Sequence, residues 1–252
     1  MHTPLKKINI VFLAFIVLLI VLLAAMALHK KTTGRYALLS FDVEPVDGQE
    51  NITELVGLLQ AEKINATFFV TGEYAEQFPR AVLLMSIKNE VGCHGYSHKS
   101  FTSMNHDEKT EEIMKCKTIV ENITGKKIEG FRAPYNRIDR DTMKILEEYG
   151  FTYDATIING LGIFYPSVKE LNMGEIPVSS MLGIPLEDVI WTYYLHMPGA
   201  FFYILQNKKS DIVSYLFHPH HIMQNPEQLK DIISHLKSQN ITFISHQQLT
   251  RT

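Results

Sequence analysis

The chain is short of the residues that mark disulfide-rich domains. Only two of its 252 residues are cysteine, Cys93 and Cys116, and only one is tryptophan. Two cysteines are too few for a disulfide scaffold, and their spacing fits no zinc ribbon. The pair is consistent with one disulfide bridge outside the cell and equally with two buried thiols, and the sequence leaves both open.

The chain also lacks an excess of positive charge. Lys and Arg number 24 and Asp and Glu number 27, so the formal net charge is −3. Basic residues cluster only briefly near the N-terminus, which argues against a nucleic-acid partner. No repeat or low-complexity segment is present, and about 200 residues can bury one full core. The composition therefore favours a single globular domain.

Long apolar runs are absent except at the N-terminus. Residues 8–28 form a run of 21 residues without a charged side chain. A helix rises 1.5 Å per residue, so a run of this length spans a bilayer core of about 30 Å. We predict that residues 1–34 form an uncleaved membrane anchor and that residues 35–252 lie outside the cytoplasm. The alternative is a cleaved signal peptide, because Ala25 and Ala27 resemble a small-x-small cleavage site.

Beyond residue 35, short apolar segments alternate with segments of helical periodicity. The predicted strands are residues 36–43, 65–72, 90–95, 128–134, 151–157, 174–179, 211–221 and 241–246. The predicted helices are residues 51–63, 79–89, 106–125, 140–150 and 226–239. Regular alternation of this kind predicts an α/β fold, in which a parallel sheet is covered by helices.

Polar side chains gather where the predicted strands end. They are Asp42, Glu44, His94, His98, Arg132, Pro134, Tyr135, His218, His220 and His221. In parallel α/β folds the active site forms at the carboxyl ends of the strands. We therefore expect these side chains to share one site.

The chemistry available to such a set is narrow. Two imidazoles and one carboxylate make a three-ligand metal site with a position left for water. A second carboxylate can accept a proton from that water, and a further histidine can donate one to a leaving amine. An arginine can hold the base ionised through a charge-assisted pair. This is the equipment of a metal-assisted amide hydrolase.

Four motifs carry a family resemblance: "SFDVEP", "HGYSHKSF", "FRAPYN" and "YLFHPHH". Their order and spacing resemble the polysaccharide deacetylase family, also called the NodB-homology or carbohydrate esterase family 4 domain, over about residues 35–250. The resemblance implies a distorted (β/α) barrel of about seven parallel strands. It also implies an enzyme with one divalent ion, most often zinc, that hydrolyses carbon–nitrogen bonds of N-acetylated amino sugars.

The resemblance assigns a role to each matching position. It makes His94 and His98 metal ligands, Asp42 the general base, Arg132 the partner of that base, His218 the general acid, and Pro134 and Tyr135 the substrate-binding wall of the groove. The implied partners are a glycan substrate and, through the predicted anchor, a membrane.

The first motif departs from the family pattern. The family has a second aspartate directly after the first, where this chain has Val43, followed by Glu44. Valine cannot bind a metal, so we predict Glu44 as the third ligand. The alternative is that Asp42 is the ligand and the base is lost. Two other functions stay open at this point, namely hydrolysis of cyclic amides and an inactive carbohydrate-binding module.

Overall fold

The computed structural model describes residues 35–159, 171–207 and 210–251. Arg35–Thr252 form one compact unit, separate from Met1–Gly34. No helix in the described ranges is long and apolar enough to cross a membrane. The anchor expected in residues 1–34 lies outside the described residues, so it stays a prediction.

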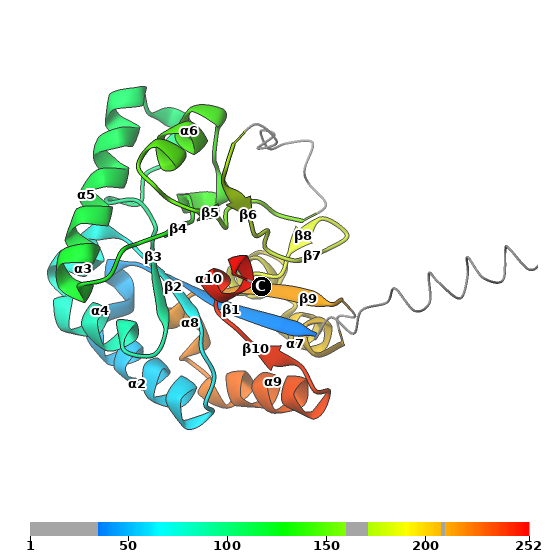
Figure 1. Cartoon of the computed structure of the whole chain (residues 1–252). Helices are drawn as coiled ribbons and strands as arrows, with labels where there is room; N and C mark the ends of the chain where they lie inside the picture. The colour runs from blue at the N-terminus through cyan, green and yellow to red at the C-terminus, as the bar shows by residue number, and fades with distance from the viewer. Residues whose placement is uncertain (1–34, 160–170, 208–209, 252) are drawn as a thin grey trace, which may run out of the picture. The chain divides into compact units, whose positions relative to one another are not determined.

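Parallel strands form the main sheet of the described chain (Figure 1). They are β1 (Tyr36–Val43), β2 (Thr67–Val70), β3 (Glu90–Cys93), β4 (Gly130–Phe131), β5 (Tyr153–Asp154), β6 (Gly174–Glu175), β9 (Ile212–Phe217) and β10 (Thr242–Phe243). The strands run in the order β10–β1–β2–β3–β4–β5–β6, and β9 also pairs with β1. The expected α/β fold with about seven parallel strands is confirmed.

The sheet curves so that the chain after its edge strand β6 comes close to β9. After β6, the chain reaches β9, where the Ser179 N–H donates to the Ser214 carbonyl oxygen at 2.9 Å. Further along, Glu187 bridges to Leu216 of β9 in parallel orientation. The result is a distorted, irregular barrel, and the short hairpin of β7 (Ser180–Met181) and β8 (Ile184–Pro185) projects between these two contacts.

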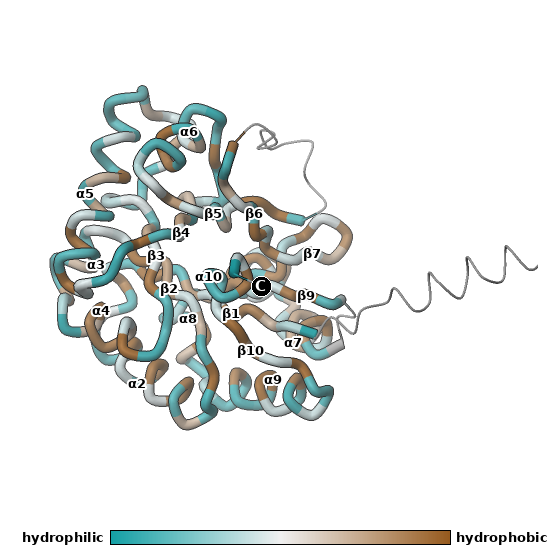
Figure 2. Tube along the Cα trace, viewed as in Figure 1, coloured by the Kyte–Doolittle hydropathy of each residue, from teal (hydrophilic) through white to brown (hydrophobic). Residues whose placement is uncertain are grey.

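Helices surround the strands (Figure 1). They are α2 (Gly48–Ala61), α3 (Gly72–Gln77), α4 (Pro79–Ser86), α5 (His106–Thr124), α6 (Arg140–Glu148), α7 (Pro198–Asn207), α8 (Pro219–Ile222), α9 (Pro226–Ser238) and α10 (His246–Thr250). Single turns η1 (Pro45–Asp47), η2 (Phe101–Ser103), η3 (Pro134–Asn136) and η5 (Ile190–Tyr194) join them. Apolar segments follow the strands and polar ones the outer turns (Figure 2).

Strand β1 lies between two hydrophobic cores, and its side chains enter them alternately. Ala37, Leu39, Phe41 and Val43 belong to the large core that also includes helix residues. Leu38 belongs to a second core with Phe69, Tyr153, Ala155, Ile176 and Ile244. Successive side chains of a strand point to opposite faces, so Asp42 shares the face of Leu38 rather than that of Val43.

The described chain also settles or corrects several expectations. Cys93 and Cys116 are free, buried thiols. The strand predicted over residues 211–221 is wrong beyond Phe217, because Pro219 stands at the first position of α8 and fits a helix start. The strand predicted over residues 128–134 keeps only Gly130–Phe131, since the chain then turns into η3.

Phe41 provides a test of the core between β1 and the helices. Its ring is fully buried and lies 5.1 Å from the Phe68 ring and 5.8 Å from the Phe217 ring, centroid to centroid. We expect Phe41→Ala to lower the free energy of unfolding by about 3–5 kcal/mol, because it removes a large side chain and leaves a cavity. Urea titration followed by circular dichroism measures the change. Leu83→Ala, at an exposed position of α4, is the control and should change stability by less than about 0.5 kcal/mol. Equal effects of the two substitutions would contradict this description of the core.

Candidate active site

A pocket of about 690 Å³ opens at the carboxyl ends of the strands. The sequence-predicted residues that line it are Asp42, Glu44, His94, His98, Tyr135, His218 and His220. Arg132 and Pro134 are buried instead, with Arg132 fully enclosed. The opposite end of the barrel is covered by α10, where the Gln247 N–H donates to the Glu90 side chain at the start of β3.

Glu44, His94 and His98 offer ligand atoms that all lie within 4.8 Å of one another. Glu44 directly follows β1, and His94 directly follows β3. His98 has a left-handed backbone, with φ 54°, and its Nε2 lies 3.1 Å from Glu44 Oε1. The two imidazole rings lie 5.0 Å apart, centroid to centroid. These three side chains could therefore bind one divalent ion.

The hydrogen bonds of His94 suit it to that task. Its Nδ1 lies 2.8 Å from the Arg132 carbonyl oxygen, which can only accept, so Nδ1 carries the proton and donates. In the neutral form of the ring, which is the form that binds a metal ion, Nε2 then carries the lone pair. A ligating histidine is usually oriented by such a bond from its other ring nitrogen. Two imidazoles and a carboxylate form a donor set that fits zinc.

Burial keeps the candidate ligand His98 neutral. Loss of solvent, followed by the charge of His94, lowers the pKa of His98 to about 3. Burial raises the pKa of Glu44, while His94 and His218 oppose that rise. A neutral imidazole is the form that binds a metal ion.

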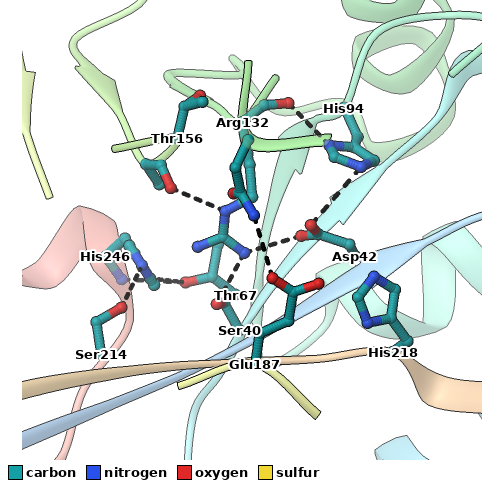
Figure 3. Close-up of polar contacts among 12 residues, drawn as sticks. Ser40, Asp42, Thr67, His94, Arg132, Thr156, Glu187, Ser214, His218 and His246 are labelled. Atoms are coloured by element: carbon teal, nitrogen blue, oxygen red, sulfur yellow. Dashed lines mark hydrogen bonds and ion pairs between the residues drawn. The ribbon is translucent and has the colours of Figure 1, made fainter. Parts of the chain in front are cut away.

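Asp42 is paired with Arg132 inside the barrel (Figure 3). Arg132 Nη1 donates to Asp42 Oδ1 at 2.8 Å and to Ser40 Oγ at 2.9 Å, and Nε donates to the Ala155 carbonyl oxygen at 2.9 Å. Although burial acts against ionisation, Arg132 and the two histidines at positions 94 and 218 lower the pKa of Asp42 below its usual value. The other oxygen, Oδ2, lies 3.6 Å from His94 Nε2.

Asp188, an acidic residue that the sequence analysis did not predict for the site, fixes the position of His218. Asp188 Oδ1 lies 2.8 Å from His218 Nδ1, and Asp188 Oδ2 accepts from the His218 backbone N–H at 2.8 Å. Burial lowers the pKa of His218, but Asp188 outweighs it and raises that pKa to about 10. The imidazolium therefore persists at neutral pH and presents Nε2 to the pocket.

Glu187 and Asp188 were missed, although one signal was available. They are the only acidic residues between Glu175 and Asp211 in the sequence. Glu187 lines the pocket and accepts a hydrogen bond from Asn136 at 3.2 Å. Burial raises the pKa of Glu187 to about 7.

Asp47 is a third buried acid that sequence reasoning missed. Its Oδ2 accepts from the Glu44 backbone N–H at 2.6 Å, and its Oδ1 accepts from the His220 backbone N–H at 2.8 Å. Oδ1 also lies 2.7 Å from His220 Nδ1. Asp47 thus fixes the turn that carries Glu44 and orients a histidine on the pocket wall, while His221 packs against His220.

Aromatic side chains stand at the mouth of the pocket. Tyr135 is 60% exposed and its ring lies 4.7 Å from that of His98, centroid to centroid. Tyr194, at the end of η5, is 76% exposed and also lines the pocket. Trp191 is buried and stacks on Phe201, so it belongs to the core.

The fold is an α/β barrel, and its pocket brings three side chains that could bind a metal ion next to an Asp–Arg pair and a His–Asp pair. Residues 29–153 match the family described as polysaccharide deacetylase. This part of the chain therefore contains a domain of that family, as the motifs predicted.

The curated relatives include a peptidoglycan deacetylase-like protein of Gibberella zeae, which is 38% identical over 107 residues. A peptidoglycan-N-acetylglucosamine deacetylase of Bacillus cereus is 32% identical over 114 residues. The matches cover 42% and 45% of this chain, but only 30% and 41% of those relatives.

Solved structures share the fold. A carbohydrate esterase family 4 pseudoenzyme from Bacillus anthracis has a TM-score of 0.66 at 20% identity, covering 86% of this chain and 65% of that one. The peptidoglycan deacetylase PdaC from Bacillus subtilis has a TM-score of 0.64 at 20% identity, covering 86% and 91%. At this identity the likeness concerns the fold.

Removal of any one of the three candidate ligands should lower the metal content of the protein. We expect His98→Ala to retain well below one equivalent of zinc, because three ligands leave no spare donor. Metal is measured by mass spectrometry after equilibration with zinc and gel filtration. His106→Ala, which removes an exposed histidine paired with Asp141, is the control and should retain wild-type metal. A full equivalent in His98→Ala would move the metal site elsewhere, and unchanged metal in Glu44→Ala would give that ligand's role to Asp42.

Proposed function

We propose that this protein is a metal-dependent hydrolase that removes N-acetyl groups from amino-sugar glycans outside the cell. A membrane anchor at its N-terminus would hold the catalytic domain there. One observation carries the proposal: two opposite charges are held side by side in one pocket. Arg132 holds Asp42 as an anion, and Asp188 holds His218 as a cation. A site that only bound glycans would gain nothing from such a pair.

The metal ion would be held by Glu44, His94 and His98. When bound, it would polarise the acetyl carbonyl and make a nearby water molecule more acidic. Asp42 acts as the general base that accepts the proton of the attacking water. Its Oδ1 is occupied by Arg132, so Oδ2 is the oxygen that takes the proton. Arg132 is a positioning residue, because it is buried and contacts only protein groups.

His218 acts as the general acid. An amine leaves an acetyl carbon poorly unless it is protonated as the bond breaks. The Nδ1 of His218 is occupied by Asp188, so Nε2 delivers the proton. General acid and general base catalysis each contribute typically 10²–10⁴-fold to the rate.

The glycan substrate is supported by the pocket mouth and by the relatives. The exposed rings of Tyr135 and Tyr194 offer flat apolar faces on which a sugar ring can stack. Three of the similar curated proteins are named as peptidoglycan deacetylases. The run of apolar residues 8–28 supports placement at a membrane with the catalytic domain outside.

The two alternatives have weaker support. Val43 was the main argument for an inactive binding module, and its side chain is fully buried in the outer core, away from the pocket. Glu44 follows on the inner side, next to His98. Hydrolysis of cyclic amides uses the same groups, so the substrate panel must include one such amide.

Removing the base or the acid should abolish most of the activity. We expect Asp42→Asn and His218→Ala each to lower kcat by about 10²–10⁴-fold, with metal content near wild type. Acetate release from chitin oligomers and peptidoglycan fragments measures activity, and hydrolysis of allantoin tests the cyclic-amide alternative. His235→Ala, on the outer helix α9, is the control and should be fully active. Loss of metal in Asp42→Asn would show that Asp42 is a ligand, and full activity in His218→Ala would reject it as the acid.

The Asp188 contact should set the alkaline limb of the pH profile. Asp188 stabilises the protonated form of His218, so Asp188→Asn lowers the His218 pKa. Because His218 must be protonated to act as the acid, the alkaline limb of kcat/KM should move to lower pH by roughly one to three units. Asp141→Asn, which alters a carboxylate paired with surface residue His106, should leave the limb in place. An unmoved limb in Asp188→Asn would assign it to another group.

A further inference from the structure

The exposed apolar side chains of the described residues are concentrated in one segment. Eleven large hydrophobic residues are exposed, and seven of these fall between residues 181 and 212. Three of them close η5 and continue into α7: Leu195, Met197 and Tyr203, which are 39%, 51% and 68% exposed. We refer to these three residues as the η5–α7 face, whereas Tyr194 before them lines the pocket.

The same segment carries no formal charge. From Val189 to Asn207 the sequence contains no Asp, Glu, Lys or Arg, although these residues make up 20% of the chain. A helix that lies on a globular core normally turns charged or polar residues outward. In α7, Phe201 and Leu205 are fully buried, yet Tyr203 on the outside is also apolar in character. The outer side of α7 is therefore not built for contact with bulk water alone.

The packing beneath this surface is well defined. Trp191 stacks on Phe201 at 6.3 Å, and Trp191 Nε1 donates to the Pro185 carbonyl oxygen at 2.7 Å. The Tyr215 hydroxyl donates to the Leu205 carbonyl oxygen at 2.8 Å, which joins α7 to β9. The exposed side chains thus stand on a fixed support.

The position of the face relates it to the start of the described chain. Ile212, 43% exposed, begins β9 beside α7 and pairs with Tyr36, the first residue of β1. The preceding residue is Arg35, and only residues 29–34 separate it from the apolar run of residues 8–28. Six extended residues reach at most about 20 Å. A bilayer that held the run would therefore be within reach of this side of the barrel.

We propose that the η5–α7 face rests on the surface of a lipid bilayer. Tyr203 would lie at the headgroup level, where a tyrosine ring places an apolar body in the acyl boundary and a hydroxyl in water. Leu195 and Met197 would enter the acyl boundary beside it. The absence of Asp, Glu, Lys and Arg removes the cost of dehydrating those ions at that depth, and His196 is the one imidazole in the segment. This inference rests on the membrane anchor of the proposed function but not on its deacetylase chemistry, since it concerns an outer surface.

Spin labels on the full chain test the contact. Tyr203→Cys and Met197→Cys place the label on the face, and Leu83→Cys places it on exposed α4 as the matched control. The native Cys93 and Cys116 are buried and remain unlabelled. The protein is reconstituted into vesicles of phosphatidylcholine and phosphatidylglycerol in equal parts. Power saturation then compares relaxation by oxygen, which concentrates in lipid, with relaxation by a water-soluble nickel complex.

We expect the oxygen-to-nickel ratio to be several-fold higher at positions 203 and 197 than at position 83. Equal ratios at all three positions would overturn the proposal. Labels at 203 and 197 that neither reagent reaches would also overturn it, because protein would then cover the face. Spin–spin broadening in that case identifies a second copy as the cover, and its absence identifies residues of the same chain. A full chain that does not float with the vesicles would reject the anchor together with the contact, whereas equal ratios on a chain that floats would reject the contact alone.

Discussion

The buried ion pair between Arg132 and Asp42 determines how the interior of the barrel is built. Two charges taken out of water are costly unless further bonds satisfy them. Here Ser40 and Ala155 accept further hydrogen bonds from Nη1 and Nε, and the guanidinium lies 4.4 Å from the centroid of the Phe69 ring, while Nη2 has no hydrogen-bond partner among the described residues. Four strands thereby converge on one side chain. The planar guanidinium fixes the orientation of the Asp42 carboxylate, and this in turn directs Oδ2 toward His94.

The same low-dielectric interior produces opposite protonation states only a short distance apart. Asp42 is anionic because a cation is bonded to it, and His218 is cationic because Asp188 is bonded to it. Burial alone would neutralise both groups. Asp42 and His218 therefore each depend on a partner that does not line the pocket. Asp42 can act as the base because its partner is the cation Arg132, and His218 can act as the acid because its partner is the anion Asp188.

The sequence pattern predicted those elements that depend on local periodicity. It did not predict side-chain contacts between residues that are far apart in the sequence. The run of residues 36–43 gave both ends of β1, and the strand-end rule brought Asp42, His94 and His218 to one pocket. Asp188 was missed because it lies 30 residues from His218 in a segment without periodicity. Asp47 was missed because its partner, His220, lies 173 residues away. Predicted strands near residues 130 and 153 shrank to two residues each, since the chain there bends toward the pocket rather than continuing the ladder.

The alternation of side chains along β1 limits which residues can stand at position 43 in the motif of Asp42, Val43 and Glu44. Val43 faces the outer core with Leu39 and Phe41, whereas the carboxylates on either side of it serve the inner side. Changing Val43 to an acid would place an unpaired carboxylate among apolar side chains, at a cost of several kcal/mol. A lineage with this spacing therefore cannot acquire the adjacent-acid arrangement through one viable substitution. It would also have to lose or gain a residue at the strand end, so the register of β1, and not residue type alone, fixes the spacing of the two carboxylates.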